Sequence, residues 1–305
     1  MFSPDSVLPY VGKPNKVFIG TNPTNEFNYH YKHNSLGFRD HEHNLTNDST
    51  IIILGLGDSF LYGAGVSMDS SILGTTEKIL SNSFSVEVFK DGMSRYYPEL
   101  YNIYFKTKGY KLNPDLLIIS VLPNDIKDTY VGSEKIKVNK DGYMMPFYSG
   151  IFGEITSKLY LKSHFFRFII YRTSRIIDMI NMPKFNEIYI ENGAYENAWL
   201  SFENDLKDIS DFAISKDVEV LILGIPQAPP WEKRHDYFFK RVSKFCKNND
   251  IKFLSAKECL LIAHKKNMSL YYTRDLHCKP IAYRTIGETL SKYIMKTFHA
   301  LYKDK

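Results

Sequence analysis

The sequence predicts an α/β fold, in which helices cover both faces of a parallel β-sheet. Three apolar runs carry this prediction, since residues 51–54, 116–122 and 218–225 are continuous and rich in β-branched side chains. Such runs are typical of strands that are buried on both faces, as parallel strands are. Segments with helical periodicity separate the runs, and this alternation favours a three-layer α/β/α sandwich.

Taken in order, the chain begins with a polar and aromatic segment, 1–49, expected to be extended with one or two short strands. The predicted strands are 51–54, 84–89, 116–122, 218–225 and 251–254. The predicted helices are 69–80, 97–110, 195–216, 237–248 and 281–301. No internal repeat or low-complexity linker divides them, so we expect a single domain over 1–305.

One stretch, 131–195, interrupts the alternation after the third strand. Residues 131–153 are turn-rich, and Asn-Lys-Asp-Gly at 139–142 predicts a hairpin turn. Residues 158–182 mix aromatic and basic side chains, a pattern typical of an amphipathic helix with snorkelling bases. We expect an insertion near the strand ends that could serve as a lid.

Composition excludes several classes of function. The net charge of +5 is spread along the 305 residues, which disfavours nucleic-acid binding. No stretch is apolar enough to span a membrane, and no signal peptide is visible, so the sequence as it stands predicts a cytoplasmic protein. If an N-terminal signal or anchor has been removed, the protein would act outside the cytoplasm. The oligomeric state stays open.

Metal binding is not expected. The three cysteines, Cys246, Cys259 and Cys278, form no C-x-x-C pair, and an odd number argues against a disulfide framework. Four histidines of the N-terminal segment are irregularly spaced, which makes a metal site there unconvincing: His30, His33, His41 and His43. We therefore expect no metal and no cofactor.

The stretch that follows the first strand points to chemistry. Gly57-Asp58-Ser59-Phe60 places Ser59 just past the strand's carboxyl end, where open α/β sheets bind ligands. Phe60 stands where a dinucleotide fingerprint needs its third glycine, no Gly-Lys-Ser/Thr triplet follows, and the G-x-S-x-G elbow is absent. Ser59 is then either a helix cap or a nucleophile.

Gly57-Asp58-Ser59-Phe60 resembles the first signature block of the SGNH (GDSL-like) hydrolase family, bacterial type. Asn-Ser-Leu-Gly-Phe-Arg-Asp at 34–40 is similar to a stretch that precedes this block in bacterial members. The resemblance implies a flavodoxin-like sheet of strand order 2-1-3-4-5, with Ser59 as nucleophile. It also implies that 34–40 packs near the site.

The base and the acid of a serine hydrolase also have candidates. His277 lies on a loop that leads into the last predicted helix, and Asp275 stands two residues before it. The family carries its Asp/His pair at this place, which makes His277 the candidate base and Asp275 the residue that orients it. The family's better-known spacing, Asp-x-x-His, would put the acid at Arg274, so Asp275 is a departure.

Donors for an oxyanion are expected at the same strand ends. Gly92 follows the second strand, where the family places a glycine that offers its backbone N–H. Asn124, in Pro123-Asn124-Asp125, resembles the third block, whose asparagine offers its side-chain amide, although Leu122 replaces the usual glycine. With the N–H of Ser59, these would form an oxyanion hole. A turn residue after a strand is the alternative for Asn124.

Together the blocks imply a metal-independent esterase that cleaves an O-acyl ester, acetyl or short-chain, through an acyl-enzyme. The expected partner is a small-molecule or glycan ester, and carbohydrate deacylation is the preferred reading. An O-acyltransferase with the same triad and an inactive binding protein of the same fold stay open. Six aromatic residues could line a substrate site, although core packing is expected for any one of them: Tyr96, Tyr97, Phe147, Tyr148, Trp231 and Tyr271.

Overall fold

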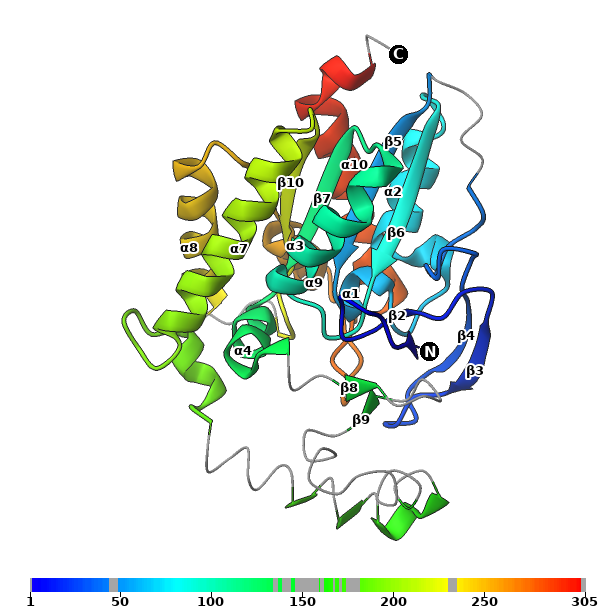
Figure 1. The fold of residues 1–305 in the computed structure, drawn as a ribbon, viewed down its shortest axis with the longest axis vertical. Helices are drawn as coiled ribbons and strands as arrows, with labels where there is room; N and C mark the ends of the chain where they lie inside the picture. The colour runs from blue at the N-terminus through cyan, green and yellow to red at the C-terminus, as the bar shows by residue number, and fades with distance from the viewer. Residues whose placement is uncertain are drawn as a thin grey trace.

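The computed structural model confirms the α/β prediction, with a five-stranded parallel sheet between two layers of helices (Figure 1). The strands run in the order β6-β5-β7-β10-β11, which is 2-1-3-4-5 when they are counted along the chain. Their bounds are β5 (Ile51–Gly57), β6 (Val86–Gly92), β7 (Leu116–Val121), β10 (Glu219–Gly224) and β11 (Lys252–Ser255). The structure describes residues 2–43, 49–133, 137–138, 144–145, 159, 162–166, 168–169, 172–173, 182–229 and 235–302.

Each face of the sheet has its own apolar core. One face carries α3 (Pro98–Thr107), α7 (Glu196–Ile214) and α8 (His235–Asn248), with Trp199 and Phe238 fully buried among them. The other face carries α2 (Ile72–Leu80), α9 (Lys257–Lys265) and α10 (Pro280–Thr297). All six residues of the central strand β7 are buried, as a strand covered on both faces requires.

Three helices differ from the expectation. The short helix α1 (Ser59–Tyr62) begins at the candidate nucleophile, and α4 (Pro123–Val131) begins where the sequence suggested only a turn. Proline is well suited to the first position of a helix because its missing N–H has no partner to lose there, so Pro123 starts a helix as well as ending the strand. Helix α9 was not expected at all.

The N-terminal segment forms two small hairpins, where the sequence analysis expected only one or two short strands. Strand β1 (Phe2–Ser3) pairs with β2 (Val11–Gly12), and β3 (Val17–Thr21) pairs with β4 (Asn28–Lys32), in both cases antiparallel. This segment lies beside β6 and below the sheet's carboxyl edge (Figure 1, dark blue).

The open edge of β6 is closed by carboxylates. Lys90 N donates to Asp40 Oδ2 at 3.0 Å, and Val88 N donates to Glu77 Oε1 at 3.0 Å. Unpaired N–H groups on an edge strand invite pairing with another chain, so these two acceptors satisfy the backbone and protect the edge.

The insertion is described only in part. Strands β8 (Lys137–Val138) and β9 (Met144–Met145) pair antiparallel and flank the predicted hairpin turn. The turn itself and most of 158–182 lie outside the described residues, so the lid stays a prediction.

The described residues also form short 3₁₀ turns, which are η1 (Met68–Ser70), η2 (Gly109–Leu112), η4 (Phe185–Tyr189) and η5 (His299–Tyr302). In the described part of the chain, no helix is long and apolar enough to cross a membrane.

Candidate active site

Ser59 lies at the first turn of α1, immediately beyond the carboxyl end of β5. The cap of this helix is the neighbouring residue, because Asp58 Oδ1 accepts the N–H of Phe60 at 2.8 Å. Gly63, with φ 75°, ends the helix in the left-handed conformation that glycine adopts without strain. The Ser59 hydroxyl is therefore not the helix cap and is free to bond elsewhere.

The structure brings His277 and Asp275 to that hydroxyl. His277 Nε2 lies 2.8 Å from Ser59 Oγ, and His277 Nδ1 lies 2.5 Å from Asp275 Oδ1. The ring of Phe60 packs on the imidazole at a centroid distance of 4.8 Å. A carboxylate at Nδ1 favours the tautomer that carries its proton there, which leaves Nε2 able to accept the serine proton.

The loop that bears the pair explains how a spacing of two residues suffices. Tyr271 bridges to Cys278, and Tyr272 N donates to the carbonyl of His277 at 2.9 Å, so the chain folds back on itself. Between the two polar residues, Leu276 adopts φ 69°, a region that a leucine rarely enters. This reversal lets Asp275 reach the ring of His277.

The two predicted oxyanion donors lie at the same edge of the sheet. Gly92 is the last residue of β6 rather than the one after it, and it pairs in register with Gly57. A Cβ at this position would lie 2.1 Å from Tyr62 N, so α1 can pack on the strand end only because residue 92 is a glycine. Asn124, in the first turn of α4, has its Nδ2 3.4 Å from Asp58 Oδ2 and 3.4 Å from Asp128 Oδ2.

Gln227 was missed by the sequence analysis. Its Nε2 donates to Asn124 Oδ1 at 2.9 Å, and this bond fixes which end of the amide faces the serine helix. A side-chain amide can otherwise flip and exchange its donor for its acceptor. No local pattern marks Gln227, although its place three residues beyond the end of β10 could have drawn attention.

Carboxyl groups gather beneath the serine. Burial raises the pKa of Asp58 and of Asp125, and it raises the pKa of Asp128 against the opposing effect of Arg95. Asp125 Oδ2 accepts the N–H of Leu122 at 2.9 Å. Burial and mutual repulsion both disfavour the charged forms of these neighbouring carboxyl groups. The cluster therefore carries less negative charge than three fully ionised aspartates would.

The 34–40 stretch packs near the site. Arg39 Nη1 donates to the carbonyls of Tyr62 and Gly63 at 2.8 and 2.6 Å, and Nη2 donates to the carbonyl of Val66. The buried guanidinium thus satisfies orphan carbonyls at the end of the serine helix.

Two of the N-terminal histidines belong to an ion-pair network. His43 Nε2 lies 2.9 Å from Asp40 Oδ2, and His43 Nδ1 lies 2.5 Å from Glu87 Oε2. His41 Nδ1 lies 3.1 Å from Asp40 Oδ1. Lys90 Nζ lies 2.6 Å from Asp40 Oδ1. By spacing alone, Asp40, His41 and His43 could hold a metal ion. The buried ammonium already neutralises the carboxylates, so the cluster is accounted for as an anchor between the N-terminal segment and β6.

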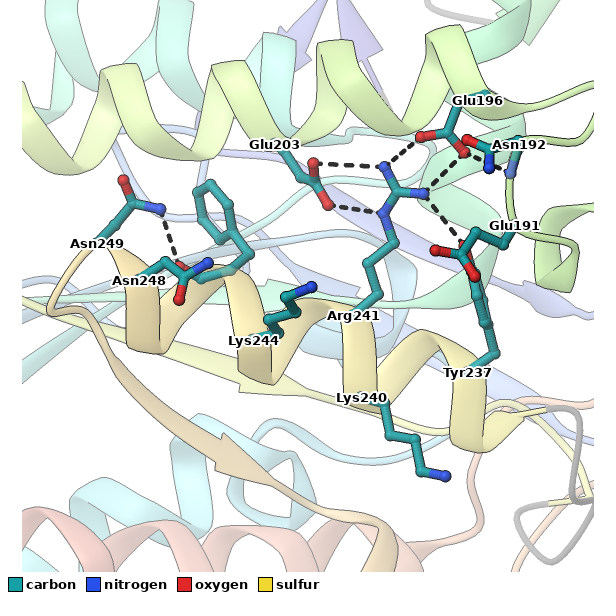
Figure 2. Close-up of a pocket in the computed structure, with 11 residues that line it drawn as sticks. Glu191, Asn192, Glu196, Glu203, Tyr237, Lys240, Arg241, Lys244, Asn248 and Asn249 are labelled. Carbon is teal, nitrogen blue, oxygen red and sulfur yellow. Dashed lines mark hydrogen bonds and ion pairs between the residues drawn. The ribbon is translucent and has the colours of Figure 1, made fainter.

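A cavity of about 400 Å³ lies elsewhere, between α7 and α8. Figure 2 shows Arg241 of α8 pointing between Glu196 and Glu203 of α7. The guanidinium lies 2.8 Å from Glu196 Oε1 and 2.7 Å from Glu203 Oε1, and it stacks on Trp199. Arg241 thus pairs with both glutamates of α7, and no candidate site residue lines this cavity.

The aromatic candidates divide as follows. Tyr96 and Tyr97 are buried in the core. The hydroxyl of Tyr271 donates to the carbonyl of Pro226 at 3.0 Å. Phe147, Tyr148 and Trp231 lie outside the described residues.

Comparison with known proteins gives structural likeness alone. No protein-family model matches the chain, and no curated protein does. Among solved structures, a catalytic mutant of an acetylxylan esterase from Geobacillus stearothermophilus is 10% identical, with 81% of this chain and 93% of that chain covered and a TM-score of 0.48. A lipase/acylhydrolase from Enterococcus faecalis is also 10% identical, with coverages of 81% and 96% and a TM-score of 0.48.

A third structure, the psychrotrophic esterase EstA from Pseudoalteromonas sp., is 10% identical, with coverages of 81% and 98% and a TM-score of 0.46. Structural similarity at such low sequence identity and TM-score carries no argument about activity. The function of the chain must be argued from its own residues.

Proposed function

We propose that this chain is a serine hydrolase of the SGNH type that cleaves an O-acyl ester. The observation that carries the proposal is the line of contacts from Ser59 Oγ to His277 Nε2, at 2.8 Å, and from His277 Nδ1 to Asp275 Oδ1, at 2.5 Å. The three side chains come from sequence positions far apart and meet at the sheet edge where ligands bind.

The proposed reaction has two steps. Ser59 attacks the ester carbonyl while His277 Nε2 takes the hydroxyl proton, and Asp275 stabilises the imidazolium that forms. The proton then passes to the departing alkoxide, leaving an acyl group on Ser59. Water attacks the acyl-enzyme with His277 again as base, which releases the acid and restores the serine.

The developing oxyanion would be stabilised by the backbone N–H groups of Ser59 and Gly92 and by the amide of Asn124. Support for Asn124 comes from the length of its present bonds. At 3.4 Å to Asp58 and to Asp128, they are longer than the usual 2.9–3.0 Å. Gln227 holds the Oδ1 end of the amide, but the two bonds from Nδ2 are weak in the resting site, so this donor has more to gain from a negatively charged oxygen.

As substrate we propose an ester of an acetyl or other short acyl group, with an acetylated carbohydrate as the first alcohol to test. The choice of acyl chain length is decided by a panel of p-nitrophenyl esters from acetate to octanoate. The choice of alcohol is decided by acetate release from acetylated oligosaccharides.

Covalent labelling tests the proposal directly. A fluorophosphonate probe should label the wild type and the exposed-serine control Ser67→Ala, and should fail to label Ser59→Ala. Turnover of p-nitrophenyl acetate should fall in Ser59→Ala by a factor on the order of 10⁴ or more. Labelling that persists in Ser59→Ala would refute the assignment, and absence of labelling in the wild type would leave a binding protein. Turnover that requires an added sugar hydroxyl would identify an O-acyltransferase.

A further inference from the structure

The loop that carries Asp275 and His277 is held by a residue near the start of the chain. The carboxylate of Glu26 accepts three consecutive backbone N–H groups, from Thr273 at 2.8 Å, from Arg274 at 3.0 Å and from Asp275 at 2.7 Å. Consecutive N–H groups that converge on one anion form a nest, and here the anion is a side chain of the same molecule. Burial works against the charge, yet these N–H groups lower the pKa of Glu26 below its usual value.

Asn22, in the same N-terminal turn as Glu26, binds the carboxylate of Asp275 itself. Asn22 Nδ2 donates to Asp275 Oδ2 at 3.1 Å, across 253 positions of sequence. Asp275 thus divides its two oxygens, with Oδ1 accepting from His277 and Oδ2 accepting from Asn22.

The orientation of the Asn22 amide is not free. Asn22 Oδ1 accepts the backbone N–H groups of Glu26 at 2.7 Å and of Phe27 at 3.1 Å, so its oxygen is committed to its own turn. The amide nitrogen must then face outward, toward Asp275. Asn22 is buried, with 5% of its surface exposed, so this arrangement is held by packing as well as by hydrogen bonds.

Tyr31, in the same N-terminal segment, contacts the turn that follows the helix of Ser59. Tyr31 Oη accepts the N–H of Gly65 at 2.8 Å, and Tyr272 Oη donates to the carbonyl of the same glycine at 2.8 Å. Phe27 packs on Tyr272 at a ring-centroid distance of 4.8 Å. The N-terminal segment therefore contacts both the loop of His277 and the turn that follows the helix of Ser59.

We propose that Asn22 and Glu26 are positioning residues that set the distance between His277 and Ser59 by fixing the 273–277 loop from outside. The proposal rests on the proposed function. Leu276 holds a positive φ of 69°, a costly conformation that persists only where surrounding contacts determine it. Glu26 supplies such contacts through the backbone N–H groups of 273–275, and Asn22 supplies one through the carboxylate of Asp275.

The kinetic test compares Glu26→Gln and Asn22→Ala with the matched control Glu42→Gln. Glu42 lies in the same N-terminal segment and also accepts a backbone N–H, from Ser35 at 2.8 Å, but within the described part of the chain its hydrogen bonds go to Ser35 and not to the 273–277 loop. Misplacing a catalytic group by about 1 Å costs on the order of a hundred-fold in rate. We expect kcat to fall by about ten- to a hundred-fold in the two test variants, with KM nearly unchanged, and to stay at the wild-type value in Glu42→Gln.

The structural test uses the same variants in a Ser59→Ala background. The proton between His277 Nδ1 and Asp275 Oδ1 should give a strongly downfield ¹H resonance, because these atoms are 2.5 Å apart. We expect this resonance to weaken or disappear in Asn22→Ala, and amide exchange over 272–278 to quicken in Glu26→Gln. Both signals should be unchanged in Glu42→Gln.

The two tests separate the failure of this inference from the failure of the proposed function. If the wild type cleaves no ester, the proposed function fails and the resonance and amide exchange alone decide the positioning role. If Glu26→Gln and Asn22→Ala keep the wild-type kcat, resonance and exchange, the positioning role is overturned. Should Asn22→Ala fail to fold, Glu26→Gln decides, because it changes a single atom on a more exposed side chain.

Discussion

Replacing Asn124 by alanine should slow the reaction strongly while lowering the stability of the fold only slightly. The variant removes one of the proposed oxyanion donors, and the loss of one such donor costs about 2.7–4 kcal/mol of transition-state stabilisation, or 10²–10³ in kcat. The ground-state bonds that are lost at the same time are weak, since Asn124 Nδ2 lies 3.4 Å from both Asp58 and Asp128. The bond from Gln227 is lost too, at a net cost of about 1 kcal/mol.

The assay is hydrolysis of p-nitrophenyl acetate, with kcat and KM measured separately and urea unfolding run in parallel. We expect kcat to fall by at least a hundred-fold, KM to change by less than about three-fold, and unfolding free energy to fall by roughly 1 kcal/mol. Asn102→Ala is the matched control, because Asn102 is also a largely buried asparagine whose Nδ2 donates to an aspartate, Asp208, at 2.8 Å.

Gln227→Ala gives the intermediate case. It leaves the donor in place and removes only the bond that orients it, so we expect a kcat loss smaller than that of Asn124→Ala. Equal kcat in Asn124→Ala and the wild type would refute the oxyanion role. A loss in kcat matched by Asn102→Ala would show that general stability, and not the donor, is being measured.

Three further predictions concern stability, all measured by urea unfolding. Gly92→Ala should destabilise by about 1–3 kcal/mol, because the new methyl group would lie 2.1 Å from Tyr62 N, and a change below 0.5 kcal/mol would show that α1 can move away. Asp40→Asn should cost about 3 kcal/mol because it removes one of the two carboxylates that pair with the buried Lys90 ammonium, Asp40 at 2.6 Å and Glu77 at 2.8 Å; a loss of unfolding free energy below about 1 kcal/mol, typical of a surface ion pair, would contradict this. Burial lowers the pKa of His33 from 6.5 to about 4, so the neutral ring stabilises the fold above pH 6.5 and that contribution is lost as pH falls toward 4. We expect wild type to lose about 2 kcal/mol more than His33→Gln between pH 7.5 and 4.5, and parallel pH curves would refute it.

Local sequence was sufficient to predict the sheet and to single out Ser59 as the candidate nucleophile. Strands that are buried on both faces have long apolar runs, and the run at 116–122 is observed as β7 (Leu116–Val121). Ser59 could be placed because a strand end and its glycines are neighbours in sequence. The start of α4 was misjudged because Pro123 both ends a strand and begins a helix, and a single-residue signal cannot say which will follow.

The chain alone therefore determined the five strands of the parallel sheet, most of the helices that cover it, and the residue types at the strand ends, but not α1, α4 or α9. Tertiary structure decided which of those side chains meet: that Asp275 reaches His277 across one residue, that Gln227 orients Asn124, and that Asn22 and Glu26 hold a loop about 250 positions away. The physical reason is that burial periodicity is a property of neighbouring residues, whereas a hydrogen bond between distant ones depends on the path of the whole backbone. Nothing around Glu26 in the sequence distinguishes it from Glu42, and only the folded chain gives them different partners.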